Sequence, residues 1–239
     1  MRIDGHVAAP ALPGLSVVIP ALNASGTLPE TLAALGEAPG EILLVDGGSA
    51  DATVALAVET GVRAILAPRG RGGQLAAGIA AAHGPWLLLL HADTRLGAGW
   101  AEAVAEVMQA SDGDHRAWHF RLALDDGSAA ARWLERVVAL RCRLLRLPYG
   151  DQALLIHSSL LAAVGGMRAL PLMEDVDLVW RLGRSRIGAL PVAALTSAER
   201  WRRDGWVARS ARNLFCLSLW LCGVPPARIA RLYAGGARR

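Results

Sequence analysis

The sequence predicts an α/β fold with a mostly parallel central sheet flanked by helices. Short apolar segments alternate with amphipathic segments over the first hundred residues, separated by connections of a few residues, as in parallel sheets with right-handed crossovers. Residues 86–90 form an unbroken apolar run, which is typical of a central strand buried on both faces. The run stops at His91-Ala92-Asp93. Polar chemistry is therefore expected at the carboxyl end of this strand, where open α/β sheets bind ligands.

Composition limits the classes of protein that the chain can belong to. The 239 residues are 53% hydrophobic, enough for one large domain or two small ones. All 25 basic residues are arginine, which excludes a P-loop lysine, a lysine Schiff base and a kinase-type lysine. Three cysteines without a C-x-x-C pair argue against a zinc ribbon or a disulfide framework and favour a reducing cytoplasm. We find no signal segment and no run long enough to span a membrane, and we expect no nucleic-acid partner.

The first half of the chain is predicted to alternate strands and helices. Residues 1–13 are expected to form a loose arm. The predicted strands cover residues 15–20, 41–46, 63–67 and 86–90, and the predicted helices cover residues 27–35, 52–59, a segment ending at residue 82, and residues 99–108. Asp46 and Asp93 follow the second and fourth strands, which places both carboxylates at one sheet edge. Asp51 is expected to cap the following helix. The loop at residues 69–74 lacks the third glycine of a dinucleotide fingerprint, but Arg69 and Arg71 could meet a phosphate at the next helix.

The second half is less regular. Strands are predicted at residues 117–124, 153–156 and 187–192, and helices at residues 132–147 and 158–164. Another helix is expected to follow residue 170 and end at residue 184. Its first turn carries Glu174, Asp175 and Asp177. These acids could compensate the helix dipole, or one of them could be a general base held at a rigid helix start.

Two helical segments leave their environment open. Over residues 132–147, four arginines fall on one helical face, whereas Trp133, Val137, Leu140 and Leu144 fall opposite. Such a helix could lie on an anionic membrane, or pack on the core as an ordinary solvated helix. Residues 214–224 are apolar all round and could form a buried or an interfacial helix. The expected organisation is the arm, a domain at residues 14–205, and a C-terminal helical extension at residues 206–239, packed on the domain or at a membrane surface.

Five motifs carry a resemblance to a known family. They are Leu15-Ser-Val-Val-Ile-Pro-Ala-Leu-Asn23, Leu44-Val-Asp-Gly-Gly-Ser-Ala-Asp51, His91-Ala-Asp93, Gly165-Gly-Met167 and Met173-Glu-Asp-Val-Asp-Leu178. In order and spacing they resemble glycosyltransferase family 2 over roughly residues 14–205. The blocks His-Ala-Asp-Thr, Tyr-Gly-Asp-Gln and Met-Glu-Asp are similar to the small stand-alone subgroup called radical-SAM/selenodomain-associated transferase 2.

The resemblance implies a GT-A (Rossmann-like) fold and an inverting transfer that uses Mg²⁺ or Mn²⁺. The donor would be a nucleotide-sugar, most often a UDP-sugar. The acceptor would be an unidentified molecule that offers a hydroxyl group, with a lipid-linked acceptor as one option. Asp175 would be the general base, with Glu174 beside it, and Asp93 with His91 would hold the metal ion. The implied nucleotide-binding residues are Pro20, Ala21, Leu22, Asn23, Asp46, Gly73, Gln74, Ala92 and Asp93. Residues for the diphosphate or the acceptor would be Arg69, Arg71, Asp151, Arg200 and Trp201.

The chain departs from the family pattern at three positions. His91 replaces the first acid of the Asp-x-Asp motif, Ala76 replaces an asparagine, and Ser197 replaces the glutamine of Gln-x-x-Arg-Trp. The last change, and the lack of spanning helices, argue against a processive polymer synthase. Two alternatives stay open: a nucleotidyltransferase that forms nucleotide-sugars, and a non-catalytic, membrane-apposed binding protein with a degenerate GT-A fold. The expected location is the cytoplasm, with peripheral attachment to the inner face of the cell membrane as an option.

Overall fold

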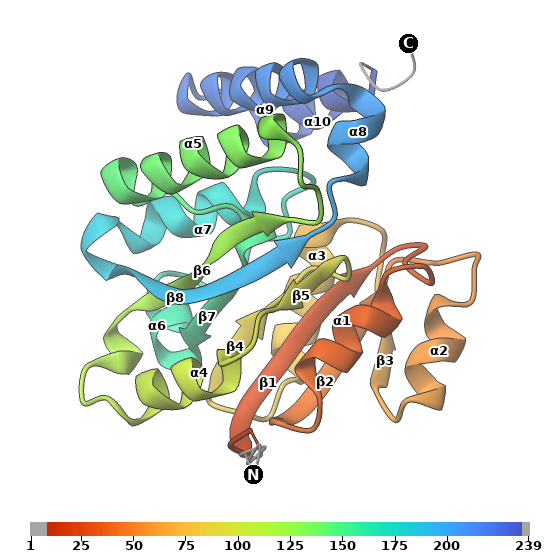
Figure 1. Cartoon of the computed structure of the whole chain (residues 1–239), viewed down its shortest axis with the longest axis vertical. Helices are drawn as coiled ribbons and strands as arrows, with labels where there is room; N and C mark the ends of the chain where they lie inside the picture. The colour runs from red at the N-terminus through yellow and green to blue at the C-terminus, as the bar shows by residue number, and fades with distance from the viewer. Residues whose placement is uncertain (1–8, 236–239) are drawn as a thin grey trace, which may run out of the picture.

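The computed structural model describes residues 9–235 and confirms the α/β fold. One eight-stranded sheet with strand order β3-β2-β1-β4-β7-β6-β8-β5 is flanked by helices (Figure 1). The pairs β1–β2, β1–β4, β2–β3 and β6–β8 are parallel, whereas β4–β7, β6–β7 and β5–β8 are antiparallel. The expected parallel sheet is therefore its N-terminal part, and antiparallel pairing joins the second half of the chain to it.

The elements follow one another closely along the chain. The strands are β1 (Leu12–Ala21), β2 (Pro39–Asp46), β3 (Arg63–Leu66), β4 (Trp86–Leu89), β5 (Thr94–Leu96), β6 (Ala117–Leu124), β7 (Leu154–His157) and β8 (Ile187–Thr196). The α-helices are α1 (Leu28–Leu35), α2 (Thr53–Glu59), α3 (Arg71–Ala81), α4 (Trp100–Gln109), α5 (Ala129–Leu145), α6 (Ser158–Ala163), α7 (Glu174–Leu182), α8 (Glu199–Asp204), α9 (Trp206–Leu221) and α10 (Pro226–Gly235). Short 3₁₀ turns lie at Gly113–His115, Gly150–Gln152 and Arg184–Arg186.

The central strand β1 is buried on both faces of the sheet. Val17 and Ile19 join the core on the side of α1 and α4, whereas Val18 joins the core on the side of α3 and α7. This alternation follows from the two-residue period of a strand. Helix α3 packs closely on β1 because Gly78 has no side chain: a Cβ there would lie 2.4 Å from Val18 Cγ1. The close packing holds the start of α3 at the carboxyl end of the sheet.

Several predicted boundaries were wrong. Strand β1 begins at Leu12, inside the expected arm, because Leu12 is buried and its N–H bonds to the Ala38 carbonyl; residues 1–8 of that arm lie outside the described residues. The three-residue strand β5 and the helix α8 were not predicted. The expected apolar helix at residues 214–224 is the second half of the longer α9. Asp51 does not cap α2 from the N-cap position but accepts bonds from Thr53 and Ser25.

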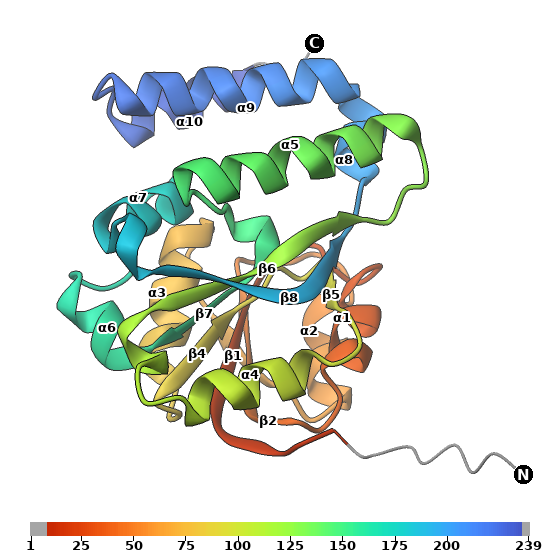
Figure 2. The ribbon, with the colours of Figure 1, turned by 60° about the vertical axis from the view of Figure 1, so that its left-hand side comes forward.

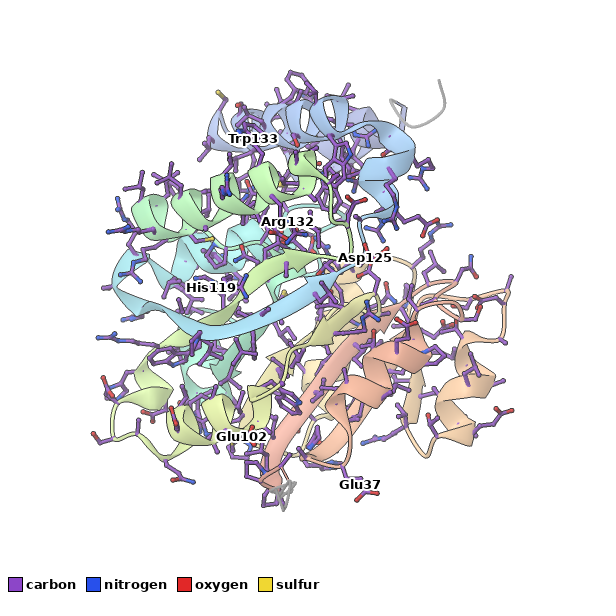
Figure 3. All side chains as sticks on the ribbon, viewed as in Figure 1. Glu37, Glu102, His119, Asp125, Arg132 and Trp133 are labelled. Carbon is purple, nitrogen blue, oxygen red and sulfur yellow. The ribbon has the colours of Figure 1, made fainter. Side chains whose placement is uncertain are left out.

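Helix α5 packs on the sheet through a face other than the Trp133 stripe. Ala131, Leu134, Val138 and Cys142 are its buried residues, whereas Trp133 is 60% exposed. Figure 3 shows Arg132 pointing back toward the end of β6, where it donates to the Leu124 carbonyl, and Trp133 pointing away from the sheet. The helix therefore packs on the core, one of the two alternatives left open for it, but the Trp133 face is not the face that packs.

A half-buried polar cluster joins the start of β2 to the loop before β4. The Glu41 carboxylate accepts hydrogen bonds from the Ser16 hydroxyl and from the backbone N–H groups of His83 and Gly84. Burial alone would raise the pKa of Glu41, but these hydrogen bonds outweigh it and lower the pKa to about 2. Because the folded pKa lies below the unfolded one, the cluster stabilises the fold above the unfolded pKa, and this stabilisation is lost as the pH falls toward about 2.

We therefore expect Glu41→Gln to lower the free energy of unfolding by about 2 kcal/mol at neutral pH. The difference from the wild type should shrink as the pH falls below the ordinary glutamate pKa, because wild-type Glu41 then becomes protonated in the unfolded chain. Urea unfolding at neutral and acidic pH measures both effects. Glu37→Gln is the matched control, since Glu37 points into solvent (Figure 3) and should change little at either pH. A pH-independent loss in Glu41→Gln would contradict the assignment.

Candidate active site

A cavity of about 560 Å³ lies at the carboxyl ends of β1 and β4. The strand order reverses there, since β1 pairs with β2 on one side and β4 on the other, and open α/β sheets bind ligands at such points. The predicted residues that line it are Pro20, Ala21, Leu22, Asn23, Arg69, Arg71, Gln74, His91, Ala92, Asp93, Asp151, Glu174, Asp175, Arg200 and Trp201. Asp46 and Gly73 were predicted as binding residues but do not belong to this lining.

Asp46 shapes the cavity from behind. It is 1% exposed, and its carboxylate accepts bonds from the N–H groups of Gly48 and Ser49 and from the Ser49 hydroxyl. The Ser49 hydroxyl in turn accepts from the Asn23 N–H at 2.8 Å, and Asn23 Oδ1 accepts from the Ala50 N–H at 2.9 Å. The geometry therefore gives Asp46 a role in holding the β2–α2 loop against Asn23, and a direct contact with the nucleoside stays a prediction.

Gln74 fixes the other side of this edge. Its side-chain amide donates to the carbonyls of Ala21 and Val45, each at 2.7 Å. Gly73, its neighbour, faces Ala169, whose Cβ would lie 4.0 Å from a Cβ added at Gly73. The start of α3 is thus fastened to the ends of β1 and β2, and the cavity floor on this side is a rigid set of backbone and amide groups.

Asp93 and Asp151 carry carboxylate oxygens that the fold leaves without partners. Among the described residues, Oδ1 of each is buried and makes no hydrogen bond. Burial raises the pKa of Asp151, which also lies near the acids Asp175 and Asp93. The end of β8 holds both loops, because the Thr196 hydroxyl donates to the Asp151 carbonyl at 2.9 Å and the Ser197 N–H donates to the Asp93 carbonyl at 3.1 Å. Unpaired buried carboxylate oxygens are costly, so a bound cation is a natural partner for them.

Arg71 links the two halves of the site. Its guanidinium pairs with the Glu174 carboxylate, lies 3.4 Å from Asp175 Oδ2, and donates to His91 Nε2 at 3.1 Å. Glu174 is 1% exposed, and burial raises its pKa, while Arg71 opposes that shift. Arg71 was predicted to meet a diphosphate, but its contacts here are the acids at the start of α7.

His91 is neutral and engaged in this arrangement. Burial, with Arg71 and Arg200 nearby, lowers the pKa of His91 well below its usual range. An arginine can only donate, so His91 Nε2 accepts from Arg71 and Nδ1 carries the proton. That proton faces Asp93, with 3.9 Å between Nδ1 and Oδ1. Neither ring nitrogen then offers a lone pair to a cation. Metal ligation by His91 stays a prediction that this geometry does not favour.

Asp175 sits at the first turn of α7 with its side chain 18% exposed. Its Oδ2 accepts from the Gly150 N–H at 2.8 Å. Glycine at position 150 lets the backbone come this close to Asp175 and His91, since a Cβ there would lie 2.8 Å from His91 Nε2. The residue before Glu174, Met173, has a left-handed backbone with φ 65°, which costs about 1 kcal/mol or more for a non-glycine residue. Strain of this kind often accompanies functional sites.

The C-terminal helices supply a wall of the cavity that was not predicted. Arg209, Asn213 and Cys216 of α9 and Tyr233 of α10 line it. Arg209 stacks on the Trp201 ring with 5.0 Å to the ring centroid, while Arg200 is 57% exposed and lies 3.8 Å from Asp93 Oδ2. The spacing of residues 209, 213 and 216 places them on one helical face, and this signal was available in the sequence. The predicted extension therefore packs against the cavity.

The donor set fits a divalent cation that shares its ligands with a bound diphosphate. Among residues 9–235 no cluster of three His, Cys, Asp or Glu side chains could hold a metal ion alone. Mg²⁺ commonly binds through one or two carboxylates and completes its shell with substrate phosphates and water. The unpaired oxygens of Asp93 and Asp151 match that requirement. Within the same described range, no helix is long and apolar enough to cross a membrane.

The mixed sheet and its cavity define a GT-A-type nucleotide-binding fold. Residues 16–169 match the family model described as glycosyl transferase family 2. The chain belongs to glycosyltransferase family 2. Among curated proteins it is similar to uncharacterized glycosyltransferases Mb0553 of Mycobacterium bovis and Rv0539 of Mycobacterium tuberculosis. Each is 36% identical over 100 residues, which cover 41% of this chain and 45% of the relative. The chain thus matches less than half of the length of these relatives.

Solved structures share the fold. Residues 1–349 of Staphylococcus aureus TarS in complex with UDP-GlcNAc superpose with a TM-score of 0.59 at 17% identity, over 76% of this chain and 58% of that one. Glucosyl-3-phosphoglycerate synthase from Mycobacterium tuberculosis, in complex with Mn²⁺ and UDP-glucose, gives a TM-score of 0.60 at 19% identity, over 88% of this chain and 79% of that one. At these identities the likeness concerns the fold.

Proposed function

We propose that the chain transfers a sugar from a nucleotide-sugar to an acceptor hydroxyl, with inversion at the anomeric carbon. One observation carries the proposal: Asp93 and Asp175, from distant parts of the sequence, line one cavity and are joined through His91, Arg71 and Asp151. A direct displacement needs charge neutralisation on the leaving diphosphate and a base for the acceptor. In this proposal the two carboxylates meet these two needs within one cavity.

The donor side is the edge formed by β1, α3 and β4. We propose that the residues 20–23 and Gln74 contact the nucleoside, with Asp46 holding their loop from behind. Asp93, with Asp151 as the second carboxylate, would hold Mg²⁺ or Mn²⁺. The cation supplies charge neutralisation and Lewis-acid activation of the diphosphate. The exposed guanidinium groups of Arg200 and Arg69 face the same cavity and add positive charge for the leaving group. UDP is the proposed nucleotide, since the TarS and synthase structures compared above hold UDP-sugars.

The acceptor side is the start of α7 and the wall formed by α8, α9 and α10. Asp175 is proposed as the base that takes the proton from the acceptor hydroxyl. The Gly150 N–H and Arg71 fix its orientation. Glu174, predicted as a second catalytic acid, is buried and paired, so we assign it to positioning Arg71. Trp201 and Arg209 present a stacked aromatic and cationic surface to an acceptor. Membership in the radical-SAM/selenodomain-associated transferase 2 subgroup, and a lipid-linked acceptor, are parts of this proposal.

The test is release of nucleotide from a panel of UDP-sugars by the purified chain, with Mn²⁺, with Mg²⁺ and with a chelator. Transferases usually hydrolyse their donor slowly when no acceptor is present, so UDP should appear with at least one sugar and fall to background with the chelator. Formation of a nucleotide-sugar from a nucleoside triphosphate and a sugar phosphate would support the nucleotidyltransferase alternative instead. No binding of UDP, GDP or CMP under any condition would favour the non-catalytic alternative.

A further inference from the structure

Helix α9 has an outward face without charge. Its inward face carries Arg209, which is 6% exposed, together with Cys216 and Leu217. Its outward side chains are Val207, Leu214, Phe215 and Leu221, between 54% and 82% exposed. Alanine, serine and cysteine fill the remaining outward positions of residues 207–222. A helix at a water-facing surface normally shows the opposite pattern, with polar residues outward.

Helix α5 repeats this inverted pattern. Trp133, Val137, Leu140 and Leu144 form a stripe along it and are 40% to 60% exposed. At 100° per residue this stripe lies nearly opposite the buried face, and the exposed Arg136 and Arg143 form a row beside it, whereas Arg132 and Arg146 donate to backbone carbonyls of the protein. The two helices are neighbours in both views: α9 and α10 lie at the end of the molecule away from the N-terminus, and α5 lies one layer nearer the sheet (Figures 1 and 2). We call the exposed apolar side chains of α5 and α9 the apolar end face.

Charge gathers around the apolar end face. Residues 129–146 hold five arginines and one acid, while the net charge of the whole chain is only +4. Arg136 and Arg143 among them are exposed beside the apolar stripe. Two aromatic side chains, Trp133 and Phe215, project from the face, and Trp180 of α7, 61% exposed, adjoins it through an edge contact with Trp220. Apolar and aromatic side chains bordered by arginine are the pattern of an element that lies in a membrane interface.

We propose that the apolar end face docks on a lipid bilayer that contains anionic lipids. The apolar side chains would enter the boundary between headgroups and acyl chains, and the arginine rows would contact lipid phosphates. A second copy of the chain is the less suitable occupant, because a symmetric contact through this face would bring its arginine rows together. The proposal concerns the exposed faces of α5 and α9 and is independent of the function proposed for the cavity.

Vesicle flotation with the full chain tests the proposal in the absence of nucleotide. The two vesicle types are pure phosphatidylcholine and phosphatidylcholine with about a quarter phosphatidylglycerol. We expect the wild type to float with the anionic vesicles at low salt. Its binding should be weaker to neutral vesicles, and weaker to anionic vesicles at high salt. Leu214→Glu/Phe215→Glu should bind the anionic vesicles more than about tenfold more weakly. Arg136→Gln/Arg143→Gln should lose most of the preference for anionic lipid.

Val58→Glu/Leu66→Glu is the matched control. These side chains are 62% and 77% exposed on α2 and β3, outside the apolar end face, and the variant adds the same two charges. It should bind vesicles as the wild type does. Circular dichroism and thermal unfolding check the fold of each variant. If Leu214→Glu/Phe215→Glu fails to fold, Trp133→Glu/Leu140→Glu on α5 takes its place.

Three results would overturn the proposal. The wild type could stay with the free protein in the presence of anionic vesicles. The glutamate variants of α5 or α9 could bind as tightly as the wild type. Finally, the wild type could form a concentration-dependent dimer that becomes monomeric in Leu214→Glu/Phe215→Glu, with no vesicle binding by the wild type or the variant. The apolar end face would then be a contact between two copies of the chain.

Discussion

Replacing Asp175 by asparagine should lower the rate of sugar transfer by about a thousandfold. Asparagine keeps the size of the side chain and can still accept from the Gly150 N–H, but it cannot take a proton from the acceptor. The loss should therefore appear in kcat, whereas the affinity for the donor nucleotide should change little, because Asp175 lies on the acceptor side of the cavity. Steady-state transfer assays with the donor found in the UDP-sugar panel, together with nucleotide titration, separate the two quantities.

Asp177→Asn provides the matched control for this prediction. Asp177 lies on the same helix, but its carboxylate pairs with Arg168 and Arg181 instead of facing the cavity. This variant should be less stable than the wild type and should retain most of its kcat. Equal losses of kcat in the two variants would indicate damage to α7 and would remove the support for Asp175 as the base.

Replacing Arg71 by methionine should lower the free energy of unfolding by about 3 kcal/mol, because it leaves the Glu174 carboxylate buried without its charged partner. Burial already raises the pKa of Glu174 in the wild type, and loss of Arg71 should raise it further. A raised folded pKa means that the folded state holds the proton more tightly. The cost of the substitution should therefore be small below the ordinary pKa of glutamate and should grow as the pH rises above it.

Arg71→Met should also reduce transfer, since Arg71 orients both His91 and Asp175. Arg69→Met is the control for stability. Arg69 is exposed on the loop before α3, and its replacement should change the free energy of unfolding by no more than about 0.5 kcal/mol. Denaturant unfolding of both variants between mildly acidic and neutral pH measures the difference. A stable Arg71→Met variant without pH dependence would show that Glu174 does not depend on this ion pair.

The sequence predicted the parallel part of the fold well because its strands are short apolar segments that alternate regularly with helices. The sheet-edge argument placed Asp93 at the carboxyl end of the sheet, whereas Asp175 and the residues 20–23 were assigned to the same site by the family resemblance; all of them line one cavity. It could not foresee that Arg71 pairs with Glu174, because the two residues are 103 positions apart and contacts of that range depend on the whole topology. Asp46 shows the same limit, since a carboxylate at a strand end can face a ligand or its own loop.

The second half of the chain was harder to predict for a physical reason. Strand β5 has only three residues and gains its stability from pairing with β8, so it has no periodic signal of its own. On α5 the apolar stripe suggested the core-facing side, yet the buried face is the less apolar one with Ala131 and Cys142. Periodicity identifies the faces of a helix but does not say which face meets the protein. For this reason the sequence predicted neither the packed face of α5 nor the cavity wall supplied by α9.

The most direct test of the donor site is calorimetric titration of the purified chain with UDP, with and without Mn²⁺, for the wild type and for Asp93→Ala. The proposal predicts that UDP binds the wild type in the presence of Mn²⁺, binds more weakly without it, and loses the dependence on Mn²⁺ in Asp93→Ala. UDP binding that is equally tight with and without the metal ion, and unchanged by Asp93→Ala, would contradict the assignment of Asp93 and of the cavity as a metal-assisted diphosphate site.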